Sequence, residues 1–262
     1  MKILLLLAAF SCSYSFAQTP EDFAVEIEPY VIPNAPGVHS YSWGMTSDNK
    51  WVIVGGRVDG LHRRQPWAAF LEQDNNKNIT VIDPVSEQVW TSDLSILPAE
   101  LFEQLQSTNQ QFYQRDTMLY ITGGYGYSTI AADHITYPNL TAISLDQVAN
   151  AVINNGNIAP FFRQITENNL KVTGGQLGLL NGTFYLVGGH LFDGAYNPMG
   201  PTHGPGFIQE YTNEIRKFEI IDDGVNLSAV NFDITTDTVN LHRRDYNMTP
   251  QIFPNGTEGF TA

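Results

Sequence analysis

Three short runs of strand-forming residues, each ending in two glycines, recur along the chain at nearly equal spacing. They are WVIVGG at 51–56, MLYITGG at 118–124 and FYLVGG at 184–189. From one run to the next, the second glycine recurs after 68 and then 65 residues. A near-constant period with one strand and one turn in each unit predicts a repeat architecture.

Turn-forming residues between apolar runs divide each period into four strands, because Asn, Asp and Gly favour tight turns between such runs. The second period also contains DQVANAVINNG, which predicts a short helix with Ser144 as a candidate cap and a stop at Gly156. In the first period, the expected strands lie at 40–46 and 51–56, and two more lie within 78–90 on the two sides of a turn at Pro84. In the second period they lie at 111–113, 118–124, 139–144 and 161–166, and in the third at 176–180, 184–189, 213–221 and 227–235. Two further strands are expected at 247–253 and 259–262.

Four strands per period, with tight turns between the first two and the last two, predict an all-β fold built of β-propeller blades. The glycine pairs need no ligand to explain them, because glycine at a strand end permits positive φ and close backbone approach. Trp90, Phe162 and Phe232 recur in the outer strands and are expected to pack between blades. The blades are expected at 39–107, 108–168 and 169–238, with the first half of a fourth at 239–262.

The repeated run of four apolar residues and two glycines, followed by a long connection and an aromatic residue in the last strand, resembles the Kelch repeat. The resemblance covers roughly residues 39–262, with periods longer than the usual length of about 50 residues. The order of motifs is also similar to that of secreted Kelch-type proteins of Bacteroidetes, which have no established activity. Because propellers close with about four to eight blades, we expect the remainder of this propeller to be missing and the chain to be a fragment.

The N-terminal residues predict export. Residues 1–17 combine Lys2, a short apolar run and a small-residue pattern ending at Ala17, as in a secretory signal peptide, and the run is too short to span a membrane. Residues 18–38 form an acidic lead-in segment whose run FAVEIE is either an isolated strand or a tail. Lipidation of Cys12 is the alternative, which Phe10 disfavours. We therefore expect a secreted, cell-surface or periplasmic protein.

Charge and cysteine content narrow the function classes. The chain carries 13 basic and 27 acidic residues and one cysteine, so the mature protein is strongly acidic and cysteine-free. An acidic surface argues against binding to nucleic acid or anionic lipid, and thiolate metal ligation is excluded. No His-x-His, HExxH or calcium-loop pattern occurs, so we expect neither a metal nor another cofactor.

The long connections carry the candidate chemistry. Strand direction alternates within a blade, so the connection after the second strand and the one between blades are expected on one face. The tetrapeptide LHRR occurs twice there, at 61–64 and 241–244, and the longest connection, 190–212, has no periodicity. Arginine can bind a carboxylate or phosphate through two planar bonds, and an aromatic ring can stack on a sugar. The candidate ligand-binding residues are Arg57, His62, Arg63, Arg64, Trp67, Tyr125, Tyr127, His134, His190, Tyr196, His203, His242, Arg243 and Arg244.

Three functions fit this pattern. The leading hypothesis is a binding or scaffolding module for a glycan, an anionic ligand or a surface protein. The alternatives are a sugar-modifying enzyme similar to sialic-acid mutarotases and a purely structural module. In the structural alternative, the arginines pair with loop carboxylates and hold blade to blade; the candidate partners are Asp59, Asp133, Asp193 and Asp245.

Overall fold

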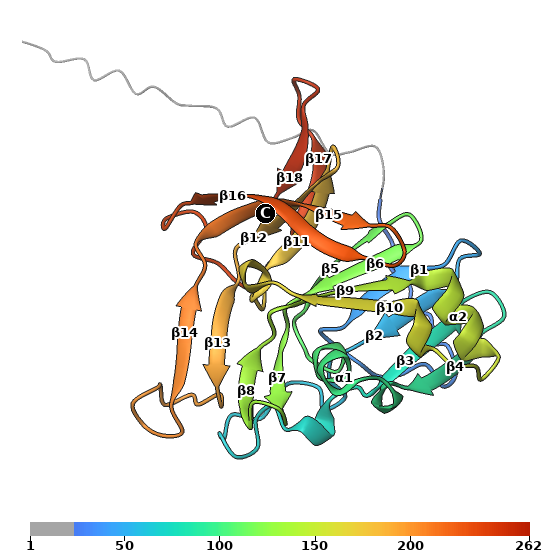
Figure 1. The fold of residues 1–262 in the computed structure, drawn as a ribbon, viewed down its shortest axis with the longest axis horizontal. Helices are drawn as coiled ribbons and strands as arrows, with labels where there is room; N and C mark the ends of the chain where they lie inside the picture. The colour runs from blue at the N-terminus through green and yellow to red at the C-terminus, as the bar shows by residue number, and fades with distance from the viewer. Residues whose placement is uncertain (1–23) are drawn as a thin grey trace, which may run out of the picture. The chain divides into compact units, whose positions relative to one another are not determined.

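Antiparallel sheets dominate the computed structural model, which describes residues 24–262 (Figure 1). The predicted signal at 1–17, with Cys12, lies outside the described residues. The chain divides into a unit ending at Val31 and a larger unit from Ile32 to Ala262, and each is considered by itself. Within the first unit, residues 24–31 form no helix or strand, so the described part of FAVEIE is not a strand.

The larger unit contains three four-stranded sheets, each a meander of neighbouring antiparallel strands. The first sheet is β1 (Ser42–Met45), β2 (Trp51–Val54), β3 (Asn78–Asp83) and β4 (Gln88–Asp93); the second is β5 (Gln111–Arg115), β6 (Met118–Thr122), β9 (Asn139–Ser144) and β10 (Phe162–Thr166); the third is β11 (Gln176–Leu180), β12 (Thr183–Val187), β15 (Glu214–Asp222) and β16 (Leu227–Thr236). These strands lie where the turn and apolar patterns predict them, and the all-β class is confirmed.

Three two-stranded hairpins accompany the sheets. The pair β17 (Thr249–Ile252) and β18 (Glu258–Thr261) is the predicted start of a fourth unit. The pairs β7 (Tyr125–Ser128) with β8 (Asp133–Thr136), and β13 (His190–Gly194) with β14 (Phe207–Tyr211), follow the second and third glycine pairs. The longest connection, 190–212, which shows no periodicity in the sequence, therefore contains a β-hairpin.

Short helices fill the connections. The predicted helix is α2 (Leu145–Ile153); Ser144 lies at its N-cap position but makes no capping hydrogen bond. The helix α1 (Ala99–Leu105) was not predicted, and it buries Leu101 and Leu105. The short 3-10 helices are η1 (Glu72–Asp74), η2 (Leu94–Ile96), η3 (Ala159–Phe161) and η4 (Asn168–Leu170).

Two apolar clusters fill the space between successive sheets. The first joins residues of β2 and β3, such as Val52 and Ile79, to Leu119 and Ile143 of the second sheet and to both α-helices. The second joins the opposite face of the second sheet to the third sheet. As predicted, aromatic residues of the outer strands take part: Phe162 belongs to the first cluster, Trp90 packs against it, and Phe232 packs against the second.

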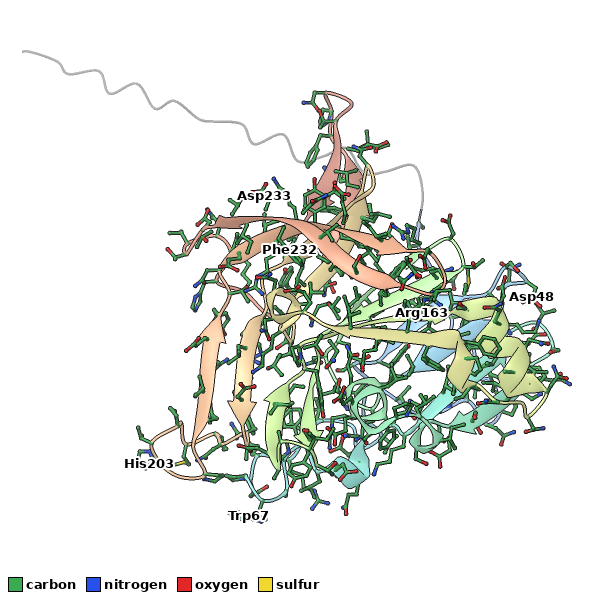
Figure 2. The ribbon with its side chains drawn as sticks, viewed as in Figure 1. Asp48, Trp67, Arg163, His203, Phe232 and Asp233 are labelled. Carbon is green, nitrogen blue, oxygen red and sulfur yellow. The ribbon has the colours of Figure 1, made fainter. Side chains whose placement is uncertain are left out.

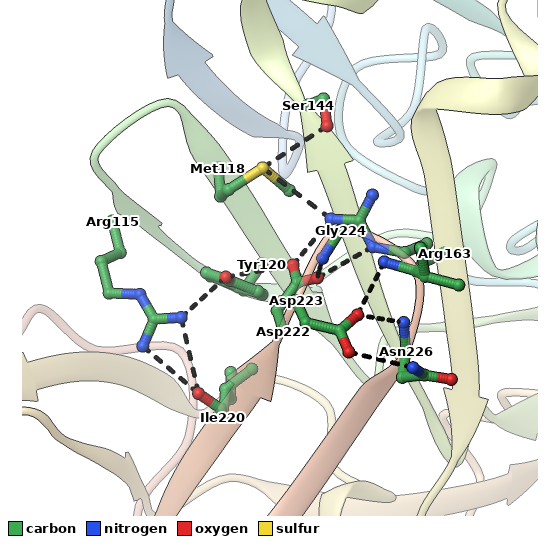
Figure 3. A network of polar contacts seen from close by, with 11 residues as sticks. Arg115, Met118, Tyr120, Ser144, Arg163, Ile220, Asp222, Asp223, Gly224 and Asn226 are labelled. Carbon is green, nitrogen blue, oxygen red and sulfur yellow. Dashed lines mark hydrogen bonds and ion pairs between the residues drawn. The ribbon is translucent and has the colours of Figure 1, made fainter.

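A polar network also connects the second and third sheets (Figure 3). The guanidinium of Arg163 donates two hydrogen bonds to the carboxylate of Asp222, at 2.9 and 2.7 Å. The hydroxyl of Tyr120 donates to the same carboxylate at 3.3 Å and accepts a bond from Arg115 at 2.8 Å. Burial acts to raise the pKa of Asp222, but the bonds from Arg163 and from the Gly224 amide outweigh it and hold the pKa below its ordinary value.

The glycine pairs occupy left-handed backbone conformations that few other residues adopt, and neighbouring atoms leave little room there for a side chain. All six glycines have positive φ, between +54° and +97°. A Cβ on Gly123 would lie 1.8 Å from the carbonyl oxygen of Val172. The amide of the second glycine in each pair donates to the segment that enters the next unit: Gly56 to Ser107, Gly124 to Val172 and Gly189 to Arg243, at 2.9, 3.1 and 2.8 Å.

A second set of repeated bonds links the points where the units begin. The amide of Asn109 donates to the carbonyl of Ser40 at 3.2 Å, that of Gly174 to Asn109 at 3.1 Å, and that of Asp245 to Gly174 at 2.8 Å. These four residues, which we term the arc, all have positive φ, between +53° and +67°. The same backbone geometry therefore recurs four times, in four different residue types.

Candidate functional site

After each glycine pair the chain runs next to the arc. The connections that follow the pairs, which are far apart in the sequence, are therefore close together in the structure. The residue after each pair forms a β-bridge with the residue just before the arc: Arg57 with His39, Tyr125 with Thr108, and His190 with Thr173. The connections that follow enclose a cavity of about 120 Å³. Its walls are His62, Phe70, Asn109, Tyr125, Thr173, His190, Phe192, Tyr196 and Arg244.

Aromatic rings in contact form one side of the cavity. The ring of Phe70 lies 4.4 Å from His62, 5.3 Å from Tyr125 and 5.8 Å from Tyr196, measured between centroids. Tyr125 also meets Phe192 edge to face at 5.2 Å. The hydroxyl of Tyr125 donates to the carbonyl of Gly194 at 2.8 Å and so ties β7 to β13. Burial raises the pKa of Tyr125, so it stays a neutral donor.

His190 contributes a neutral imidazole. Its side chain is buried, and the amide nitrogen of Gln209 lies 3.0 Å from Nδ1. An amide nitrogen can only donate, so Nδ1 accepts and the proton of the neutral ring lies on Nε2. Burial, with a smaller effect of Arg244, lowers the pKa of His190 to about 4. The ring therefore offers a ligand an N–H donor without a charge.

Among residues 24–262, Arg244 is the one Lys or Arg that lines the cavity, and no Asp or Glu of that range lines it. Its Nε donates to the hydroxyl of Tyr211 at 3.3 Å, and one terminal nitrogen bonds the carboxylate of Asp245 at 3.2 Å. The side chain remains 43% exposed, so part of its guanidinium can reach a ligand. Burial raises the pKa of Asp245, and Arg244 acts against that shift.

Arg57 is buried and pairs with a loop carboxylate. Its side chain is 1% exposed and donates two bonds to the carboxylate of Asp59, both at 2.9 Å. A third bond, of 2.9 Å, reaches Asn75. The guanidinium lies 5.3 Å from the ring centre of Phe70 and supports the aromatic wall from behind.

The structure brings some of the predicted site residues together and separates others. Those that line the cavity are His62, Tyr125, His190, Tyr196 and Arg244. Those that pack behind its walls are Arg57, Tyr127, His134 and His242. Those that do neither are Arg63, Arg64, Trp67, His203 and Arg243; Figure 2 shows Trp67 and His203 at the edge of the molecule.

The residues behind the walls are held in place. The Nε2 of His134 lies 3.0 Å from the carbonyl of Phe70, and the ring stacks on Tyr125 at 5.7 Å. Burial lowers the pKa of His134. The ring of His242 stacks on Tyr211 at 3.9 Å, which in turn contacts Arg244. These residues orient the wall and do not form it.

Four wall residues were not predicted: Phe70, Asn109, Thr173 and Phe192. Asn109 and Thr173 lie at or next to the arc, so the repeat period could have identified them once the arc was known. Phe192 lies in HLFDG, where its neighbours Leu191 and Asp193 give no alternation of apolar and polar residues that would mark a strand. Phe70 has a positive φ in an irregular connection and carried no signal in the sequence.

Within residues 24–262, no three His, Cys, Asp or Glu side chains are grouped so as to hold a metal ion. The helices described there are all too short or too polar to cross a membrane. The sequence matches no known family model and no curated protein.

Proposed function

We propose that this chain is an exported Kelch-like propeller module that binds a carbohydrate carrying a carboxylate. The cavity supports this proposal through one combination of features. An arginine and a neutral histidine N–H lie beside a wall of aromatic rings, and no carboxylate of the described residues lines the cavity. The arginine suits a carboxylate, and the rings suit the apolar face of a sugar.

The proposed propeller arrangement is supported by the repeats. Three meander sheets pack face to face in chain order, and the arc and the glycine pairs recur in each unit. In such an arrangement the connections after each second strand gather at one end of the axis. In proteins generally, binding residues are often carried by loops on a rigid scaffold, and these connections are such loops.

The size of the cavity suits one terminal sugar. Its volume of about 120 Å³ is below the roughly 300 Å³ at which pockets for drug-sized ligands begin. A ligand therefore enters by an end group, with the rest of a glycan outside. A uronic acid or a sialic acid at the end of a chain has the required carboxylate, hydroxyls and apolar ring face.

Calorimetric titration with glucuronic acid and N-acetylneuraminic acid, with glucose as the neutral comparison, tests the proposal. We expect saturable binding of an acid and none of glucose. Arg244→Gln should weaken acid binding by about 10- to 100-fold, because a charged hydrogen bond contributes about 1.5–3 kcal/mol. Arg64→Gln, outside the cavity, should not change it. Equal losses in the two variants, or no binding of either acid, would contradict the proposal.

A further inference from the structure

Two neighbouring arginines of the first connection, residues 57–77, have no partner among the described residues. Arg63 and Arg64 are exposed, and neither guanidinium makes a hydrogen bond or an ion pair with any residue of 24–262. Every other Lys or Arg side chain in that range donates at least one such bond. Carboxylates are abundant in a chain with 27 acidic and 13 basic residues, so these two unpaired charges stand out and are available to a ligand.

The carboxylates of the same connection are already paired. Asp59 accepts two bonds from the buried Arg57, whose guanidinium also lies 3.7 Å from the carboxylate of Asp74. The carboxylate of Glu72 binds Lys77 at 2.8 Å. The sequence of 57–77 contains no other Asp or Glu. This connection therefore leaves no carboxylate for the two free arginines.

The same segment also presents an exposed indole. The carbonyl of Gln65 accepts bonds from the amides of Ala68 and Ala69, both at 2.9 Å, and both alanines are buried. Trp67 lies within this turn, yet it is 79% exposed (Figure 2). The buried alanines fix the turn, and the indole beside them faces solvent. A tryptophan ring has a flat apolar face on which a sugar can stack.

The first connection reaches the cavity through His62. The ring of His62 lies 4.4 Å from Phe70 and 4.8 Å from Tyr196, and its Nδ1 lies 3.0 Å from the carbonyl oxygen of Arg63. Because an extended chain advances at most about 3.6 Å per residue, the Cα atoms of Arg63 and Arg64 lie within roughly 7 Å of that of His62. Both arginines are therefore attached beside the wall that His62 contributes.

We propose that Arg63, Arg64 and Trp67 form a second subsite, which binds the sugars that follow the end group held in the cavity. This inference rests on the proposed function and narrows the ligand to an oligosaccharide with a carboxylate on successive sugars. Each guanidinium binds a carboxylate through its planar donors, and the indole packs on a ring face. Negative charge elsewhere on the chain opposes a long polyanion, so the subsite suits a short acidic oligosaccharide.

Calorimetric titration of the full chain with glucuronic acid, N-acetylneuraminic acid and the linear trimer of each acid tests the subsite. We expect a trimer to bind about 10-fold more tightly than its monomer, through two exposed charge pairs and one stacked ring. Arg63→Gln/Arg64→Gln should remove this gain and leave monomer binding unchanged. Lys50→Gln/Lys217→Gln is the matched control. It lowers the net charge equally, in the turn between β1 and β2 and in β15, and should keep the gain.

A trisaccharide with glucuronic acid at its end and two neutral xyloses separates charge from length. It should bind equally to the wild type and to the double arginine variant. Salt at about 1 M, where the Debye length is about 3 Å, should remove most of the gain of the acidic trimer. The acidic trimer should also change the tryptophan emission of the wild type. Trp67→Phe should abolish that change, because the described walls of the cavity contain no tryptophan.

The outcomes separate this inference from the proposed function. Monomer binding with a trimer that binds no more tightly, or a gain that survives Arg63→Gln/Arg64→Gln, would overturn the subsite and leave the cavity proposal standing. Trimer binding that needs both arginines, without any monomer binding, would support the subsite and contradict the proposal for the cavity. Binding of neither monomer nor trimer would contradict both.

Discussion

The glycine pairs and the walls of the cavity lie only a few residues apart in the chain, yet different bonds hold them. Around each of the three pairs, backbone hydrogen bonds reach residues at equivalent positions of the repeat. The walls that follow differ: an irregular connection after the first pair, and the hairpins β7–β8 and β13–β14 after the others. The repeated part therefore constrains backbone shape, and the variable part places side chains.

The two LHRR segments show the same difference at the scale of four residues. In the first, His62 lines the cavity and both arginines are exposed outside it; in the second, Arg244 lines it and His242 packs behind. The first follows a glycine pair, and the second enters the fourth unit through the arc. Position in the repeat decides which member of an identical tetrapeptide reaches the cavity.

The largest expected difference between the glycine pairs and the connections that follow them is in the effect of substituting a glycine. Gly123→Ala would place a methyl group 1.8 Å from the Val172 carbonyl oxygen at a φ of +64°. We expect the free energy of unfolding to fall by about 4 kcal/mol, from left-handed strain and overpacking together. Urea denaturation followed by circular dichroism measures this.

Gly60→Ala is the matched control in the first connection. Gly60 has a similar φ, +68°, but no atom lies within 4 Å of the position that its methyl group would take. Only the conformational strain of about 1–2 kcal/mol should remain. Equal losses at the two glycines would mean that the contact with Val172 contributes nothing.

The sequence predicts the repeated part well, because its signals are local. Strand-forming runs, Asn-Gly turns and the glycine pairs each indicate a backbone conformation from a few neighbouring residues. The arc was harder to predict, because Ser40, Asn109, Gly174 and Asp245 share a backbone conformation and no side chain. The helix α1 was missed for another reason: its segment AELFEQL is seven residues long and is stabilised by burial against the first cluster.

Lowering the pH should destabilise the folded protein through His190, which lines the cavity. Its pKa falls from an ordinary 6.5 to about 4 on folding, so between these pH values the unfolded chain binds a proton that the folded protein does not. Stability present above pH 6.5 is therefore lost as the pH falls, by about 3 kcal/mol at pH 4. Unfolding of wild type and His190→Gln across this range measures the effect.

The difference between the two proteins isolates His190. His134, whose pKa burial also lowers, and the paired carboxylates contribute to both curves. We expect the variant to lose less stability than the wild type between pH 6.5 and pH 4. Parallel curves would show that groups other than His190 cause the loss of stability in this pH range.

The cavity itself was predicted only in part. The sequence indicated connections that carry histidines, arginines and tyrosines, because strand alternation sends those connections to one end of the sheets. It could not rank the arginines: Arg57 is buried by Asp59 and Asn75, whereas Arg244 stays accessible. That distinction depends on contacts between distant segments, which no local pattern reports.

The smallest effect concerns the bond between the two hairpins. Tyr125→Phe removes the hydroxyl that donates to Gly194 at 2.8 Å and leaves a carbonyl without that partner, at a cost of about 1–2 kcal/mol. Amide hydrogen exchange in β13 should become faster, while exchange in β6 and β12 stays unchanged. Tyr127→Phe keeps the ring contact with His134 and should alter neither. Faster exchange throughout β6 and β12 would show that the hairpins and the sheets open as one unit, contrary to the separation drawn between them.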